Sequence, residues 1–68
     1  MSNRIVGAQQ RARQRGVLAA SLERQGAYEQ AAEQWTAAAV AWGTNAGQVQ
    51  YCNDRAHHCR HQLKRRAA

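Results

Sequence analysis

One stretch of the sequence, residues 27–42, restricts the fold more than any other. Its large and small apolar residues recur at offsets of three, four and seven, which places them on one face of a helix. These residues are Tyr28, Ala31, Ala32, Trp35, Ala38, Ala39 and Trp42. Because aromatic rings alternate with pairs of alanines, a neighbouring helix can press into the gaps between the rings. The stripe therefore predicts a helix that packs against another helix.

A shorter helix is expected just before this stripe. Residues 17–25 place Leu18, Ala19 and Leu22 on one face, and Gly26 follows as a left-handed terminator. The two helices together have the spacing of a tetratricopeptide helical hairpin, of which the chain holds one copy. Since solenoid arrays need about three copies or more, an array is excluded. The predicted structural core consists of Leu18, Leu22, Ala31, Trp35 and Ala38.

A third helix is expected after the break at residues 43–47. Gly43 can end the preceding helix, and Asn45 can cap the next one, with Gln48 three residues on. Beyond it, apolar residues alternate steps of three and four and form a narrow seam, made of Val49, Cys52, Ala56, Cys59 and Leu63. With no proline and few β-branched residues, the chain is predicted to be all-α. The architecture is a three-helix arrangement, the tetratricopeptide-like hairpin plus a C-terminal helix.

The first 16 residues are predicted to be a basic, partly ordered N-terminal arm, followed by a helical domain at residues 17–66. Gly7 and Gly16 interrupt an otherwise acceptable helix. The alternative is that the arm continues the first helix, because Ile5, Ala8 and Ala12 extend a heptad spacing toward residue 22. The sequence does not decide between the two.

At 68 residues, the chain is too short to bury a generous core, and much of its apolar content is alanine. Small domains of this kind commonly gain burial from a second copy, so we expect a homodimer. No apolar run approaches the roughly 20 residues needed to cross a bilayer, and the start lacks the apolar core of a secretory signal. We expect a cytoplasmic protein that does not contact membranes.

The stretch from Leu18 to Cys59 carries a pattern in two halves. The first half consists of Ala19, Leu22, Glu23, Arg24, Gly26, Tyr28, Ala31, Ala32 and Trp35. The second half consists of Asn45, Tyr51, Cys52, Arg55 and Cys59. This pattern resembles the ANR family, the negative regulators of AraC-type transcription activators. The second half separates that family from the more distant PerC-like small regulators, which share mainly the first half. The chain departs from the pattern at Tyr51, where tryptophan is expected, and in its long basic ends.

The resemblance implies a small bacterial regulator that binds an AraC-type activator and reduces activated transcription, usually as a dimer. In this interpretation the hairpin is a scaffold, and the third-helix seam or an exposed apolar part of the second helix contacts the partner. The predicted partner-binding residues are Tyr28, Trp42, Val49, Cys52, Arg55 and Cys59.

Direct nucleic-acid binding is the alternative function. The net charge is +6, and it is concentrated at the two ends of the chain. In the last helix, phosphate contacts would come from Arg60, Lys64, Arg65 and Arg66. No convincing recognition helix or distinctive set of base-reading side chains accompanies these cations.

Neither catalysis nor a cofactor is expected. The carboxylates Glu23, Glu29, Glu33 and Asp54 occupy surface-like positions, without a partnered nucleophile or a glycine-rich phosphate loop. The cysteines and histidines between Cys52 and His61 project from several sides of one helix, whereas zinc sites normally take ligands from two segments. We therefore expect no metal site, no cofactor and no enzyme activity.

Overall fold

The protein folds into three helices connected by two short turns. The structure is a computed structural model that describes the backbone of residues 2–67 and the side chains of residue 7 and residues 9–67. The helices are α1 (Ser2–Arg24), α2 (Tyr28–Trp42) and α3 (Ala46–Ala67), and residues 2–67 contain no strand. The all-α class and the three-helix arrangement are confirmed. Of these helices, none has the length and apolar character that crossing a membrane requires.

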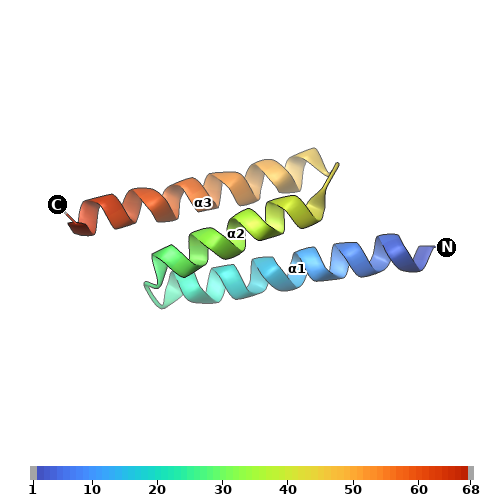
Figure 1. The fold of residues 1–68 in the computed structure, drawn as a ribbon, viewed down its shortest axis with the longest axis horizontal. Helices are drawn as coiled ribbons and strands as arrows, with labels where there is room; N and C mark the ends of the chain where they lie inside the picture. The colour runs from blue at the N-terminus through green and yellow to red at the C-terminus, as the bar shows by residue number, and fades with distance from the viewer. Residues whose placement is uncertain (1, 68) are drawn as a thin grey trace.

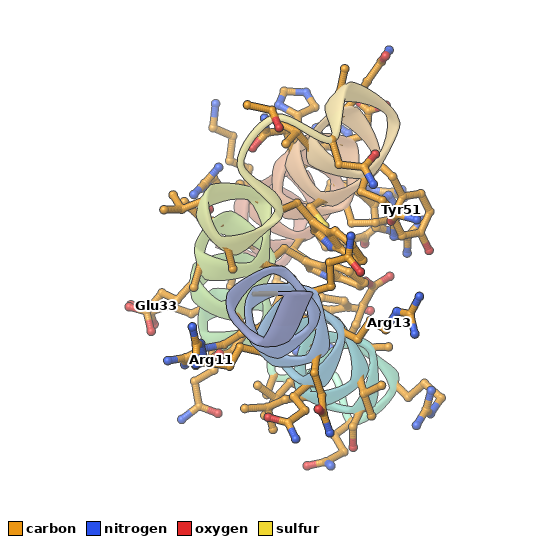
Figure 2. The ribbon with its side chains drawn as sticks, turned by 90° about the vertical axis from the view of Figure 1, so that its right-hand side faces the viewer. Arg11, Arg13, Glu33 and Tyr51 are labelled. Carbon is orange, nitrogen blue, oxygen red and sulfur yellow. The ribbon has the colours of Figure 1, made fainter. Side chains whose placement is uncertain are left out.

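The shortest helix, α2, lies between the two longer ones (Figure 1). It packs along both α1 and α3, whereas α1 and α3 have little direct contact with each other. The chain runs up, down and up again, so that its two ends lie at opposite ends of a molecule measuring 50 × 20 × 12 Å. Seen end-on in Figure 2, α1 and α3 both lie to one side of α2. The helices therefore form a shallow V with α2 at its base.

The first helix begins at Ser2 and not at Val17, so the structure has the continuous helix that was the alternative to a partly ordered arm. Gly7 and Gly16 lie inside α1, although two such glycines cost a helix on the order of 1 kcal/mol each. Gly16 lies against the Trp35 ring, where a Cβ would make an ordinary van der Waals contact at 3.6 Å. The side chains of Ile5 and Ala8, on which the heptad argument depended, lie outside the described residues.

The turn residues act as the sequence predicts. Gly26 has a φ of 79°, and the Ala27 N–H donates to the Leu22 carbonyl at 2.9 Å, as in a Schellman termination of α1. Gly43 ends α2 with a φ of 62°. The Asn45 side chain accepts a hydrogen bond from the Gln48 N–H at 3.3 Å and caps α3.

The core is built almost entirely from small side chains. Ala31, Trp35 and Ala38 lie in it, and Leu22 packs against its edge. Its buried members are Ala19, Ala31, Ala32, Trp35, Ala38, Ala39, Cys52, Ala56 and Cys59. Small residues at the contact lines allow the helix axes to approach closely, which is why dispersion contacts can form without large aliphatic groups.

Leu18 is not a core residue, contrary to the prediction. Its side chain is 45% exposed, and the neighbouring Val17 is 70% exposed. The face of α1 that meets α2 carries Ala12 and Ala19, both fully buried, and a bulky leucine there would hold the helices apart. The two aliphatic side chains instead line a hollow on the outer surface of α1 with Gln10, Arg13, Gln14 and Ser21.

The two glycines at the ends of helices provide a test of the fold. We expect Gly26→Ala to destabilise the protein by about 1–2 kcal/mol, because its φ of 79° lies in the left-handed region that L residues avoid. Gly47→Ala should instead raise stability by up to about 1 kcal/mol, since a Cβ in the first turn of α3 meets nothing within 4 Å. Urea denaturation followed by circular dichroism measures both. Equal stability of the two variants would contradict the assigned end of α1.

Candidate functional site

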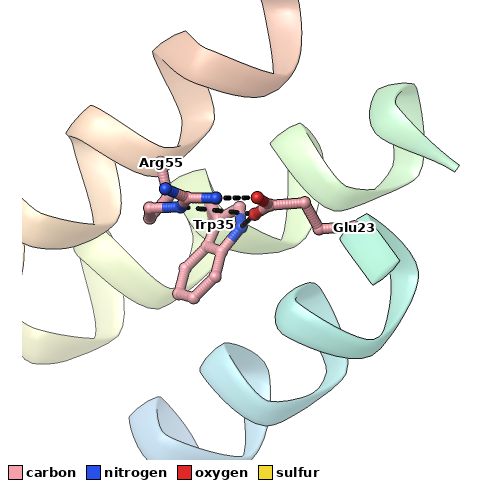
Figure 3. A network of polar contacts seen from close by, with 3 residues as sticks. All are labelled: Glu23, Trp35 and Arg55. Carbon is pink, nitrogen blue, oxygen red and sulfur yellow. Dashed lines mark hydrogen bonds and ion pairs between the residues drawn. The ribbon is translucent and has the colours of Figure 1, made fainter. Parts of the chain in front are cut away.

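One carboxylate connects all three helices (Figure 3). The Trp35 indole N–H on α2 donates to Glu23 Oε1 on α1 at 3.0 Å. On α3, Arg55 Nε donates to the same oxygen at 3.4 Å, and Arg55 Nη2 forms an ion pair with Glu23 Oε2. Because α1 and α3 have little other contact, this bridge fixes their positions relative to each other.

The bridge is shielded from water. The Glu23 side chain is 14% exposed and that of Arg55 is 35% exposed, while Trp35 is buried. Hydrogen bonds to an ionised carboxylate are stronger than neutral ones, and partial burial strengthens them further. The expectation that Glu23 occupies a surface position is therefore wrong. Glu29 and Glu33 do lie on the exposed surface of α2.

Above the bridge, the open side of the V is hollowed into a depression that we call the aromatic groove. Its volume is about 270 Å³. It is lined by Ala20, Glu23 and Arg24 of α1, Tyr28 and Trp35 of α2, and Tyr51 and Arg55 of α3. Figure 2 shows Tyr51 and Arg13 on this side of the molecule, and Arg11 and Glu33 on the opposite side. The groove thus combines aromatic rings with arginines.

The aromatic rings of the groove are held in place by neighbours. Tyr51 stands perpendicular to Trp35, with ring centroids 5.7 Å apart and planes at 87°, a favourable edge-to-face pair. The Arg66 guanidinium covers the Tyr28 ring at 4.7 Å and donates to the Gly26 carbonyl at 3.1 Å. Tyr51 is nevertheless 54% exposed, so its ring is both fixed and accessible.

The predicted partner-binding residues fall into three groups. Tyr28 and Arg55 line the aromatic groove. Trp42 and Val49 are half-buried and pack against the core away from the groove. Cys52 and Cys59 are buried in the core, so the prediction that they contact a partner is wrong. Their seam on α3 is the surface that packs against α2.

Burial also determines the chemistry of the two cysteines, which are free thiols. Burial raises the pKa of Cys52, and it raises the pKa of Cys59 against a smaller lowering by Arg55 and Arg60. Both thiols therefore stay protonated at neutral pH and are poor nucleophiles and metal ligands. His57, His58 and His61 lie on the exposed surface of α3. Within residues 2–67, no three His, Cys, Asp or Glu side chains are grouped as metal ligands would be.

The cations predicted to contact phosphates are only partly available. Arg60 Nη2 donates to Thr36 Oγ1 on α2 at 2.9 Å, and Arg66 is bound to Gly26 and Tyr28. Lys64 and Arg65 are exposed. Two of the four side chains thus help to attach α3 to the rest of the molecule.

Sequence reasoning missed three residues of the groove as functional candidates: Glu23, Arg24 and Tyr51. A signal existed for Tyr51, because it precedes Arg55 by one helical turn and the two share a face of α3. Glu23 could not be paired with Arg55, which is 32 residues away in the sequence. That contact depends on how the helices pack.

Comparisons with protein-family models, with curated proteins and with solved structures found no match to this chain. The function is therefore argued from the groove and from the pattern of residues in the sequence.

The carboxylate bridge can be tested by removing its charge. We expect Glu23→Gln to lower the free energy of unfolding by about 1–3 kcal/mol, because it leaves the half-buried Arg55 without its counter-ion. The matched control is Glu33→Gln, the same change on the exposed surface of α2, which should stay within about 0.5 kcal/mol of the wild type. Chemical denaturation of both variants is the measurement, and similar losses in both would refute the bridge.

Proposed function

We propose that this protein is a small, non-enzymatic, cytoplasmic transcription regulator that binds an AraC-type activator through the aromatic groove and thereby inhibits it. One observation carries the proposal: of the seven residues that line the groove, all except Ala20 occupy positions of the ANR-like pattern, five with the residue of the pattern and Tyr51 with tyrosine in place of tryptophan. These six residues come from all three helices, and folding brings them to one surface.

The remaining residues of the pattern have structural tasks. Gly26 and Asn45 form the two turns, and the core holds Ala19, Ala31, Ala32, Cys52 and Cys59. The pattern therefore divides into residues that build the fold and residues that line the groove. A pattern needed for the fold alone would not require Arg24, which is exposed beside the groove.

The composition of the groove favours a protein partner. Tryptophan, tyrosine and arginine are the side chains most enriched at the energetic centres of protein interfaces. Tyr51 supplies an exposed ring that Trp35 already orients, so little side-chain entropy is lost on binding. The volume of about 270 Å³ lies at the lower end of the range for small-molecule sites, and it is large enough to admit a side chain of a partner.

The alternative, nucleic-acid binding through α3, has less support. All four cations are exposed, but Arg60 and Arg66 already bind acceptors within the molecule.

The predicted homodimer stays a prediction. Val17 and Leu18 on the outer surface of α1 are exposed aliphatic side chains that a second copy could cover.

A pull-down with a reporter assay tests the proposed function. The wild type should retain an AraC-type activator and reduce transcription from its promoter. Tyr51→Ala should weaken retention by about tenfold or more, as expected for an aromatic anchor of an interface. Val40→Ala is the matched control, because Val40 is 77% exposed on α2 and does not line the groove.

Each outcome of this experiment is informative. The proposal is supported if Tyr51→Ala loses retention of the activator and Val40→Ala keeps it. Absence of activator binding, together with a mobility shift of DNA at physiological salt that Lys64→Gln and Arg65→Gln abolish, would overturn it in favour of the alternative.

A further inference from the structure

The aromatic groove lies on the open side of the V, between α1 and α3. α1 and α3 run in the same direction on either side of it, and both pack on α2 rather than on each other. In Figure 2 the side chain of Tyr51 lies on the open side of the V, on the side away from α2. A pair of flanking helices with aromatic side chains between them is a setting into which another helix can pack, as in a four-helix arrangement.

The length of the groove limits how much of an occupant it can contact. On α2 its lining runs from Tyr28 to Trp35, which corresponds to roughly 10 Å of helix at about 1.5 Å per residue. An occupant helix would therefore be in contact over about two turns. Its central apolar side chain would lie against the exposed ring of Tyr51.

The charges around the groove favour an occupant with negative charge. The groove is lined by two arginines and one glutamate, and Glu23 is already paired with Arg55, so Arg24 carries the excess positive charge. Arg13 adds a second cation on the same side, while the exposed Glu33 lies on the opposite side (Figure 2). Carboxylates on the occupant would thus be attracted, and lysines or arginines repelled.

We propose that the aromatic groove holds an acidic amphipathic helix of the partner protein, with apolar residues against Tyr51 and Trp35 and carboxylates beside Arg13 and Arg24. This inference rests on the proposed function and names the chemistry of the contact. The bridge between Glu23 and Arg55 sets the width of the aromatic groove, because it fixes the separation of α1 and α3.

Single-stranded nucleic acid fits the groove less well, although it is also acidic. Bases bind by stacking on the faces of aromatic rings. The Tyr28 ring is covered by Arg66, Trp35 is 4% exposed, and Tyr51 stands at 87° to Trp35. The rings therefore offer no continuous surface for successive bases.

A second copy of this chain is also a poor occupant. The acidic surface that it could offer is the outer face of α2, with Glu29 and Glu33. Insertion of that face into the groove of a neighbour would be a head-to-tail contact that leaves an open groove on the next copy. Such a contact does not close into a dimer.

The probe for this inference is a designed 18-residue helical peptide with leucines on one face and glutamates flanking them. Its controls are the same peptide with lysine in place of glutamate and a single-stranded oligonucleotide. Binding to the full chain is followed by tryptophan fluorescence and calorimetry. We expect the acidic peptide to bind at least about tenfold more tightly than the lysine peptide.

A matched pair of variants locates the site. Arg13→Glu and Arg11→Glu make the same charge change on α1, but their side chains lie on opposite sides of the molecule. Arg13→Glu should weaken the acidic peptide about five- to tenfold, and Arg11→Glu should have an effect below about twofold. Equal binding of the two peptides, equal effects of the two variants, or displacement of the acidic peptide by the oligonucleotide would overturn the inference.

The two proposals fail differently. If the acidic peptide binds with the expected dependence on Arg13 but no activator is retained, the groove is assigned correctly and the regulatory function is wrong. If the activator is retained equally by Arg13→Glu and wild type and is not displaced by the peptide, the function stands and the acidic helix is wrong.

Discussion

The carboxylate of Glu23 is the contact on which the arrangement of the helices depends. It accepts a hydrogen bond from Trp35 on α2 and pairs with Arg55 on α3. The packing of alanines and cysteines holds each outer helix to α2, but such small side chains leave the angle between α1 and α3 weakly determined. A directional, partly buried bridge supplies the missing constraint. The same three residues form the floor of the aromatic groove, so the structural bridge and the candidate site are one feature.

The shallow V also explains why a chain of this size exposes an aromatic ring. With α2 alone at the base, Trp35 fills the gap between α1 and α3, and Tyr51 covers one edge of it. Trp35 is already buried, and a further helix on the open side of the V would cover the exposed Tyr51 ring, whereas residues 2–67 supply three helices. The Tyr51 ring is exposed and held in one orientation, and Arg24 adds an excess positive charge beside it. These features favour the proposal that another protein occupies the groove.

The sequence predicts the helices well because their signals are local. Gly26, Gly43 and Asn45 act within one turn of the chain, and the stripe from Tyr28 to Trp42 defines the buried face of α2. It predicts the packing less well. Periodicity predicts a core position for Leu18, which is 45% exposed, because it identifies faces but not which neighbour is near enough to exclude a large side chain. The sequence leaves the start of α1 open, since Gly7 and Gly16 lower helix propensity and local pattern does not show whether packing offsets that cost. The pairing of Glu23 with Arg55 joins residues that are distant in sequence, so no local pattern contains it.

The most direct test of the central bridge is hydrogen exchange of the two tryptophan indole N–H groups, followed by nuclear magnetic resonance. Trp35 Nε1–H is bonded to Glu23 at 3.0 Å and its side chain is buried, while Trp42 is half-buried at the edge of the core. If the bridge holds the three helices together, Trp35 should exchange only through global unfolding, and its protection should match the free energy of unfolding. Exchange of Trp35 as fast as that of an exposed indole, in a protein that remains folded, would contradict the account.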